Sequence, residues 1–150
     1  MEGFISKCIS VVLIFIMLVI APMITIYGQH EAQGRMEILN EVTSFLDKVT
    51  DKSRIDQEDI DAFTVQIESH GLVLSVTIDR LVKTVTITNV ATGEVDTSYI
   101  PADDISSISS GDIIKVTVKE ISTTPYKKLL KTFLKVDEPA FELSLAKMAR

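Results

Sequence analysis

The pattern of apolar positions starts with one long run close to the N-terminus. From Cys8 to Tyr27 no residue carries a charge. At about 1.5 Å rise per residue, a helix over this run spans roughly 30 Å, the thickness of the hydrocarbon layer of a membrane. Pro22 interrupts the run, but membrane helices tolerate proline with a kink when a neighbouring group such as Thr25 satisfies the freed carbonyl. We therefore predict a transmembrane helix over 8–27.

Three interpretations of the N-terminal region compete. A cleaved secretory signal has an apolar core of about 7–15 residues and an A-x-A-like site, whereas this run is longer and is followed only by Ala32 with His30 two residues before it. A prepilin-type leader is cut after a glycine that precedes an apolar helix, and Gly3-Phe4 offers such a junction. A retained single-pass anchor fits the length best. Lys7 then places residues 1–7 in the cytoplasm and the following domain outside the cell membrane.

The second pattern is amphipathic and helical. Apolar residues recur every three or four positions after the span, at Ile38, Leu39, Val42, Phe45, Leu46 and Val49. This spacing predicts a membrane-proximal helix over 28–52, continuous with the span. A second helix is predicted from Asp56, as N-cap, to His70-Gly71. The acidic residues of its first turn favour the helix dipole, and their order lacks the pattern of a calcium loop.

At Gly71 the apolar period changes from 3.6 to 2, which indicates strands. The alternation predicts strands over 72–79, 84–88, 94–100 and 113–120, and a final strand from Phe141 almost to the C-terminus. A short turn is predicted between the first two strands, a second turn at Thr92-Gly93 and a loop over 101–111. Between the last two strands, Thr124-Pro125 predicts the start of a third helix that ends at Glu138-Pro139. The fold class is therefore α+β, with helices packed on a small, mainly antiparallel sheet. Residues 53–150 form one extracytoplasmic globular unit with the preceding helix.

The charge distribution narrows the classes of partner. The 150 residues include 15 Lys and Arg against 21 Asp and Glu, a net charge of −6, which argues against nucleic acid as a partner. The densest basic group lies on the third predicted helix, at Lys127, Lys128, Lys131 and Lys135. We interpret it as the solvated face of that helix, with contact to a membrane surface or a partner as the alternative.

The residue types of enzyme active sites are sparse. The only histidines are His30 and His70, and the single cysteine, Cys8, lies at the edge of the span. Cysteine–histidine catalysis and a cysteine zinc site are thereby excluded for the domain. No glycine-rich phosphate loop is present either. We predict no catalytic residue, no cofactor and no metal site, and we do not expect an enzyme.

Two segments carry a resemblance to a known family. They are the amphipathic stretch EILNEVTSFLDKVTDKSRIDQEDIDAFTVQIESHG after the span and the later GDIIKVTVKE. The chain resembles the TadE-like, pseudopilin-like proteins of tight-adherence (Flp-type) pilus systems. In this sequence Cys8 occupies the fifth position after Gly3, where pilins usually carry Glu.

The resemblance implies a pilin-like fold and the role of a minor pilin or assembly component. Its partners would be the membrane and other pilin-like or assembly-platform proteins, in a homo- or hetero-oligomer. Ser10, Pro22 and Thr25 are then candidates for packing against other membrane helices. The competing hypothesis is a single-pass, membrane-tethered extracytoplasmic binding domain of the cell envelope, and an anchored enzyme is the third.

Overall fold

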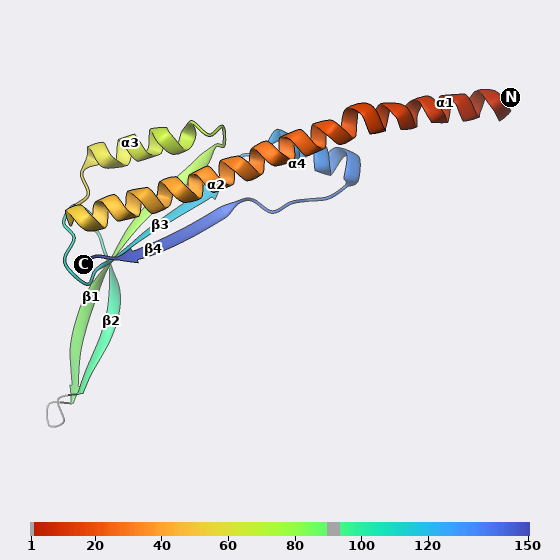
Figure 1. Cartoon of the computed structure of the whole chain (residues 1–150). Coiled ribbons are helices and arrows are strands. Elements are labelled where there is room, and N and C mark those ends of the chain that lie inside the picture. Colours follow the sequence, from red (N-terminus) through yellow and green to blue (C-terminus); the bar gives the residue numbers. More distant parts are fainter. Residues whose placement is uncertain (1, 90–93) are drawn as a thin grey trace. The chain divides into compact units, whose positions relative to one another are not determined.

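The computed structural model describes residues 2–89 and 94–150 and has an α+β architecture. The predicted turn at Thr92-Gly93 lies outside the described residues. In chain order the elements are α1 Glu2–Phe15, η1 Ile16–Ile20, α2 Ala21–Lys52, α3 Gln57–Glu68, β1 Leu74–Asn89, β2 Glu94–Ala102, β3 Ile113–Glu120, α4 Pro125–Leu129, η2 Leu130–Leu134 and β4 Glu142–Met148 (Figure 1). The elements η1 and η2 are single π-helical turns.

The chain forms two compact units. The first, the helical unit, comprises residues 1–36 and 123–139, and the second, the sheet unit, comprises residues 37–122 and 140–150. Helix α2 begins in the helical unit and ends in the sheet unit. Each unit is described by itself below.

The helical unit contains the apolar run. One helix among the described residues, Gly3–Lys52, is long and apolar enough to cross a membrane. Its apolar side chains from Phe4 to Val19 are exposed. This agrees with the predicted span and with its continuation into an amphipathic helix that ends at Lys52.

Pro22 is accommodated by the π turn that directly precedes it. The N–H of Ala21 donates to the carbonyl of Ile16, five residues back, and such a widened turn is a common way for a helix to absorb a local irregularity. The suggested role of Thr25 is wrong, because its hydroxyl donates to the carbonyl of Ala21 at 3.0 Å. The carbonyl that proline frees belongs to Leu18, four residues before it.

The sheet unit is built on a four-stranded antiparallel sheet. Its strand order is β2-β1-β3-β4. Strand β3 is central and alternates as predicted, with Ile114, Val116 and Val118 fully buried. These side chains share one core with residues 38–49 of α2 and with Phe63 and Ile67 of α3. The rings of Phe45 and Phe63 stack there, 4.2 Å apart between centroids.

Two predicted strands are one continuous strand. The sequence predicts a turn between 79 and 84, but β1 runs unbroken through this segment. Its first half pairs with β3, from Leu74 to Leu81, and its second half pairs with β2 from Arg80 onward. The predicted turn therefore lies where the strand changes partner, and Arg80, within it, has a buried carboxylate to pair with.

Two predicted helix ends also need correction. The third helix ends at Leu134 instead of Glu138, because Lys135 adopts a left-handed conformation with φ 53°. Asp56 does occupy the N-cap position of α3, but its side chain makes no capping hydrogen bond and pairs with Arg54 at 2.8 Å. The predicted end at His70-Gly71 is confirmed, since Gly71 has the positive φ of 76° that glycine tolerates.

Helix α3 offers a matched test of the core. Ile67 is completely buried, whereas Val65, on the same helix, is 69% exposed. We expect Ile67→Ala to lower the free energy of unfolding by about 2–5 kcal/mol, because it removes packed apolar atoms and leaves a cavity. Val65→Ala should change it by less than about 0.5 kcal/mol. Chemical denaturation of the full chain in detergent measures both, and equal effects would contradict this core.

Candidate functional site

The residues predicted for leader cleavage and for packing of the span all lie on the helix of the helical unit. Gly3 and Phe4 are in the first turn of α1, and both are exposed. Ser10 is exposed, and its hydroxyl donates to the carbonyl of Ser6 at 3.0 Å. Pro22 and Thr25 follow the π turn and are also exposed. The structure therefore places these residues at exposed positions spread along one helix.

Segment 123–139 lies against the helix of this unit near the C-terminal end of the apolar run (Figure 1). A close approach occurs at Gly28. A Cβ atom there would lie 3.1 Å from the ring of Tyr126, closer than side chains normally pack. Glycine at position 28 thus lets the Tyr126 ring rest on the helix backbone.

A buried carboxylate connects the same two segments. Glu31 is buried and accepts hydrogen bonds from the hydroxyl of Thr124 and from the guanidinium of Arg35, each at 2.5 Å. Arg35 also lies 3.7 Å from Glu138. The Thr124 oxygen in turn accepts from the N–H of Lys127, which caps α4. The carboxylate is thus compensated by a cation and a hydroxyl, as burial of a charge requires.

The lysines of α4 and η2 do not share one solvated face, so that prediction is wrong in part. Lys127 is buried, and its ammonium group donates to the carbonyl of Pro139 at 2.9 Å. Lys128, Lys131 and Lys135 are exposed, and Lys131 pairs with Asp137 at 3.2 Å. The ammonium group of Lys127 bonds to a carbonyl 12 residues further along the chain, which the 3.6-residue period does not anticipate.

Two open apolar grooves lie where η2 meets the helix. One has a volume of about 250 Å³ and is lined by Phe15, Val19 and Phe133, among others. The other, of about 400 Å³, includes Ile16 and Leu134 and again Phe133. Phe133 is 51% exposed and Leu134 is 57% exposed. The apolar surface of η2 therefore continues that of the predicted span.

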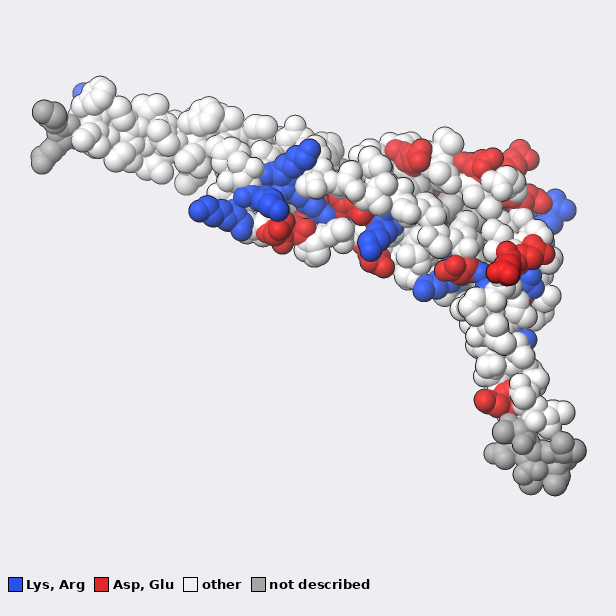
Figure 2. Space-filling model, turned by 180° about the vertical axis from the view of Figure 1, so that it is seen from behind, with Lys and Arg blue, Asp and Glu red and all other residues white. Residues whose placement is uncertain are grey.

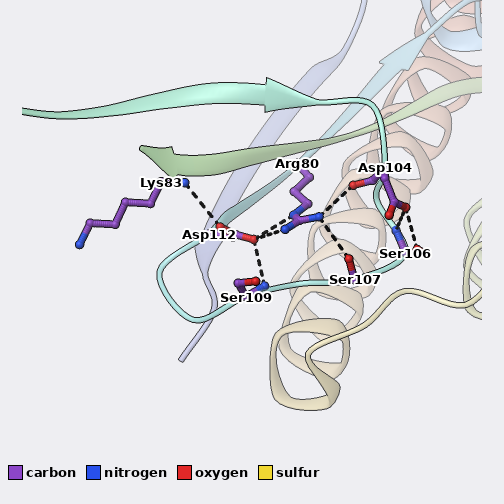
Figure 3. Close-up of polar contacts among 7 residues, drawn as sticks. All are labelled: Arg80, Lys83, Asp104, Ser106, Ser107, Ser109 and Asp112. Carbon is purple, nitrogen blue, oxygen red and sulfur yellow. Dashed lines mark hydrogen bonds and ion pairs between the residues drawn. The ribbon is translucent and has the colours of Figure 1, made fainter. Parts of the chain in front are cut away.

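In the sheet unit, the main polar cluster surrounds Asp112 (Figure 3). The carboxylate receives the guanidinium of Arg80 at 2.7 Å and the N–H of Ser109 at 2.9 Å. Arg80 also donates to the carbonyl of Asp104 at 3.1 Å. Burial opposes ionisation, but the Ser109 amide and the Arg80 guanidinium outweigh it and lower the pKa of Asp112. The cluster ties the loop before β3 to strand β1.

Neighbouring polar residues of that loop are also satisfied internally. The hydroxyl and N–H of Ser106 both donate to Asp104, at 2.7 and 2.8 Å, and these bonds lower the pKa of Asp104. The acidic and serine-rich loop is thus organised by its own hydrogen bonds. Among the described residues, no group of three or more His, Cys, Asp or Glu is placed to hold a metal ion.

Asp59 has a second role that the sequence does not reveal. The sequence explains the acidic first turn of α3 by the helix dipole, but Asp59 is also buried and paired with α2. Its carboxylate lies 2.7 Å from the ammonium of Lys48 and 3.1 Å from that of Lys52. Hydrogen bonds from these two lysines lower the pKa of Asp59 to about 2.

The chain was compared with known protein families, curated proteins and solved structures. No protein family, curated protein or solved structure matches this chain.

The pairing of Asp59 predicts a specific acid sensitivity. Its pKa is about 2 in the folded chain and about 3.9 in an unfolded one. The ionised group therefore stabilises the fold above pH 4, and this stabilisation is lost as the pH falls toward 2. Asp59→Asn should flatten the dependence of unfolding free energy on pH in this window. A variant as acid-sensitive as the natural chain would contradict the pairing.

Gly28 predicts a steric effect confined to segment 123–139. Gly28→Leu should displace Tyr126 and expose the chain around Lys127 and Lys128, so that trypsin cleaves there faster. Gly3→Leu is the matched control, because a Cβ at Gly3 meets nothing within 4 Å. Limited proteolysis followed by mass spectrometry measures the rates, and unchanged cleavage of the Gly28 variant would exclude the close approach.

Proposed function

We propose that the protein is a membrane-anchored minor pilin or pseudopilin-like component of a bacterial pilus or secretion assembly, with its C-terminal domain on the outer side of the membrane. The observation that carries this proposal is the unbroken helix Gly3–Lys52. Its apolar N-terminal part is uncovered, whereas Ile38, Val42 and Val49 further along are fully buried in the core of the sheet unit. Such a helix can serve both as anchor and as the assembly surface.

The physical basis of assembly is helix packing. Lipid tails are as apolar as the helix surface, so association inside a membrane depends on close packing of small residues and on interhelical hydrogen bonds. Ser6 and Ser10 are four residues apart and exposed on one face of α1. The uncovered surface around them is available to a second helix, from another copy or from another pilin-like protein.

The sheet unit favours the second candidate function, a membrane-tethered binding domain. Strands β1 and β2 extend as a two-stranded ribbon beyond the part of β1 that pairs with β3. Val85, Ile87 and Val95 are more than half exposed there, and Ile87 lies directly opposite Val95. Directly opposed residues point to the same face of a sheet. Ile87 and Val95 therefore form an exposed apolar surface to which a partner protein can bind.

A pilin-like role requires the particular side chains of the span for assembly, whereas a tethered binding domain requires only that the span stay in the membrane. We expect that replacing residues 8–20 by a leucine helix of equal length, with Gly3, Phe4 and Lys7 kept, leaves the protein in the membrane but removes it from surface fibres or assembly complexes. Membrane fractionation, mechanical shearing and co-purification from the producing cells measure this. A leucine span that supports assembly as well as the natural one would exclude the pilin-like role and favour the tethered domain.

Leader cleavage can be tested without disturbing the fold. Gly3 lies in helical conformation, and a Cβ there meets no atom within 4 Å. Gly3→Ala is therefore structurally harmless, and alanine favours the helix. If a prepilin-type peptidase acts after Gly3, this variant should keep its N-terminus while the natural chain begins at Phe4. Intact mass measurement of both chains decides the matter, and an uncleaved natural chain would refute cleavage.

A further inference from the structure

The two units differ in the sign of their charge. The helical unit has six Lys or Arg against four Asp or Glu, whereas the sheet unit has nine against seventeen. Four of the six basic residues of the helical unit lie within 127–135. The only unit that contains an uncovered apolar helix is thus the basic one. Figure 2 shows Lys and Arg side chains gathered beside the uncharged length of that unit.

The position of this basic group along the helix matters. The grooves place Phe133 and Leu134 beside Phe15 to Thr25, which is the C-terminal half of the predicted span. At 1.5 Å per residue, Ile16 lies about 16 Å before Tyr27 along the helix. Segment 125–135 therefore reaches a level at which the helix itself is expected to be surrounded by lipid.

The lysines of segment 125–135 are arranged in a way that suits the surface of a lipid layer. Lys127 is buried and bonded within the unit. Lys128 and Lys135 are exposed, and among the described residues their ammonium groups have no hydrogen-bond or ion-pair partner. Lysine has a long apolar stem that can lie along acyl chains while its ammonium group reaches the headgroups. Exposed aromatic and aliphatic residues next to lysines are the composition of an interfacial element.

We propose that segment 125–135 is a membrane-surface element, in which Lys128, Lys131 and Lys135 bind the phosphate groups of anionic phospholipids while Phe133 and Leu134 enter the apolar layer. The occupant of the two grooves is then lipid acyl chain. The segment is held to the helix by Tyr126 on Gly28 and by Thr124 on Glu31. These two contacts hold the lysines at a fixed position along the helix. The boundary of the hydrocarbon layer then lies near Phe133, at a level closer to Ile20 than to Tyr27.

The proposal depends on insertion of the helix and is independent of any role in a pilus. Each lysine near an anionic surface contributes roughly a fivefold preference for it. Three lysines on one short segment should therefore enrich anionic lipid locally. An acidic sheet unit offers no comparable attraction.

The absence of tryptophan from the chain makes the test direct. Phe133→Trp introduces a single tryptophan in the full chain, which is reconstituted in phosphatidylcholine vesicles with phosphatidylglycerol. Either lipid is brominated on its acyl chains, at equal mole fraction, and quenching is compared. Leu18→Trp serves as the reference for bulk lipid, because Leu18 is an exposed residue of the span that lines neither groove. Val65→Trp, on α3, serves as the reference outside it.

We expect both lipids to quench Phe133→Trp, with brominated phosphatidylglycerol severalfold more effective there than at Leu18→Trp. Adding Lys128→Gln, Lys131→Gln and Lys135→Gln should remove this excess. The matched control, Lys115→Gln, Lys119→Gln and Arg150→Gln, removes the same charge from the sheet unit and should preserve it. The proposal is overturned if Phe133→Trp is quenched no more than Val65→Trp, or if both lipids quench it equally while Leu18→Trp reports an inserted helix.

Discussion

One long helix has exposed apolar side chains in its N-terminal part and buried ones in its C-terminal part, and the rest of the structure depends on this difference. From Phe4 to Val19 the apolar side chains of the helix are uncovered, and from Ile38 onward the apolar side chains of one face are buried against the sheet and α3. Uncovered apolar surface of this extent costs about 25 cal/mol for each Å² that water contacts. A membrane, or other helices within it, is the environment that removes this cost. One helix would then have its N-terminal part in lipid and its C-terminal part in the core of the sheet unit.

Buried charges hold the segments that cover this helix. Glu31 binds Thr124 in the helical unit, and Asp59 binds Lys48 and Lys52 in the sheet unit. Asp112 and Arg80 do the same for the loop before β3. Because an unpaired buried charge is far more costly than a paired one, each pair disfavours arrangements in which its partner is displaced. The pairs therefore define which segments meet, while apolar burial supplies most of the stabilisation.

The two proposals use different surfaces of the protein. Assembly through helix packing uses the uncovered face of α1, whereas lipid binding uses the exposed lysines and Phe133 of segment 125–135. A lysine-rich segment held beside the span defines how deeply the helix sits in the membrane. It would also define the level at which α1 meets a neighbouring helix. Lipid binding and assembly are therefore compatible in one molecule.

Local patterns determined a large part of the fold. The unbroken apolar run, the spacing from Ile38 to Val49 and the alternation in β3 depend only on neighbouring residues, and each was predictable. The identity of the span residues that contact partners stays a prediction, because no partner helix covers them in the single chain. The apolar composition alone carries the membrane assignment, since lipid recognises no particular sequence.

Contacts between distant residues decided the rest. The sequence determined that an uncharged helix precedes an acidic α+β unit, because hydrophobic period and charge are properties of the chain itself. Only the tertiary structure decided that β1 is one strand, since Arg80 lies across from two different strands and meets Asp112. It alone decided that Lys127 is buried and that its neighbouring lysines lie beside the span. A side chain's environment is set by segments far away in the sequence, which no local period contains.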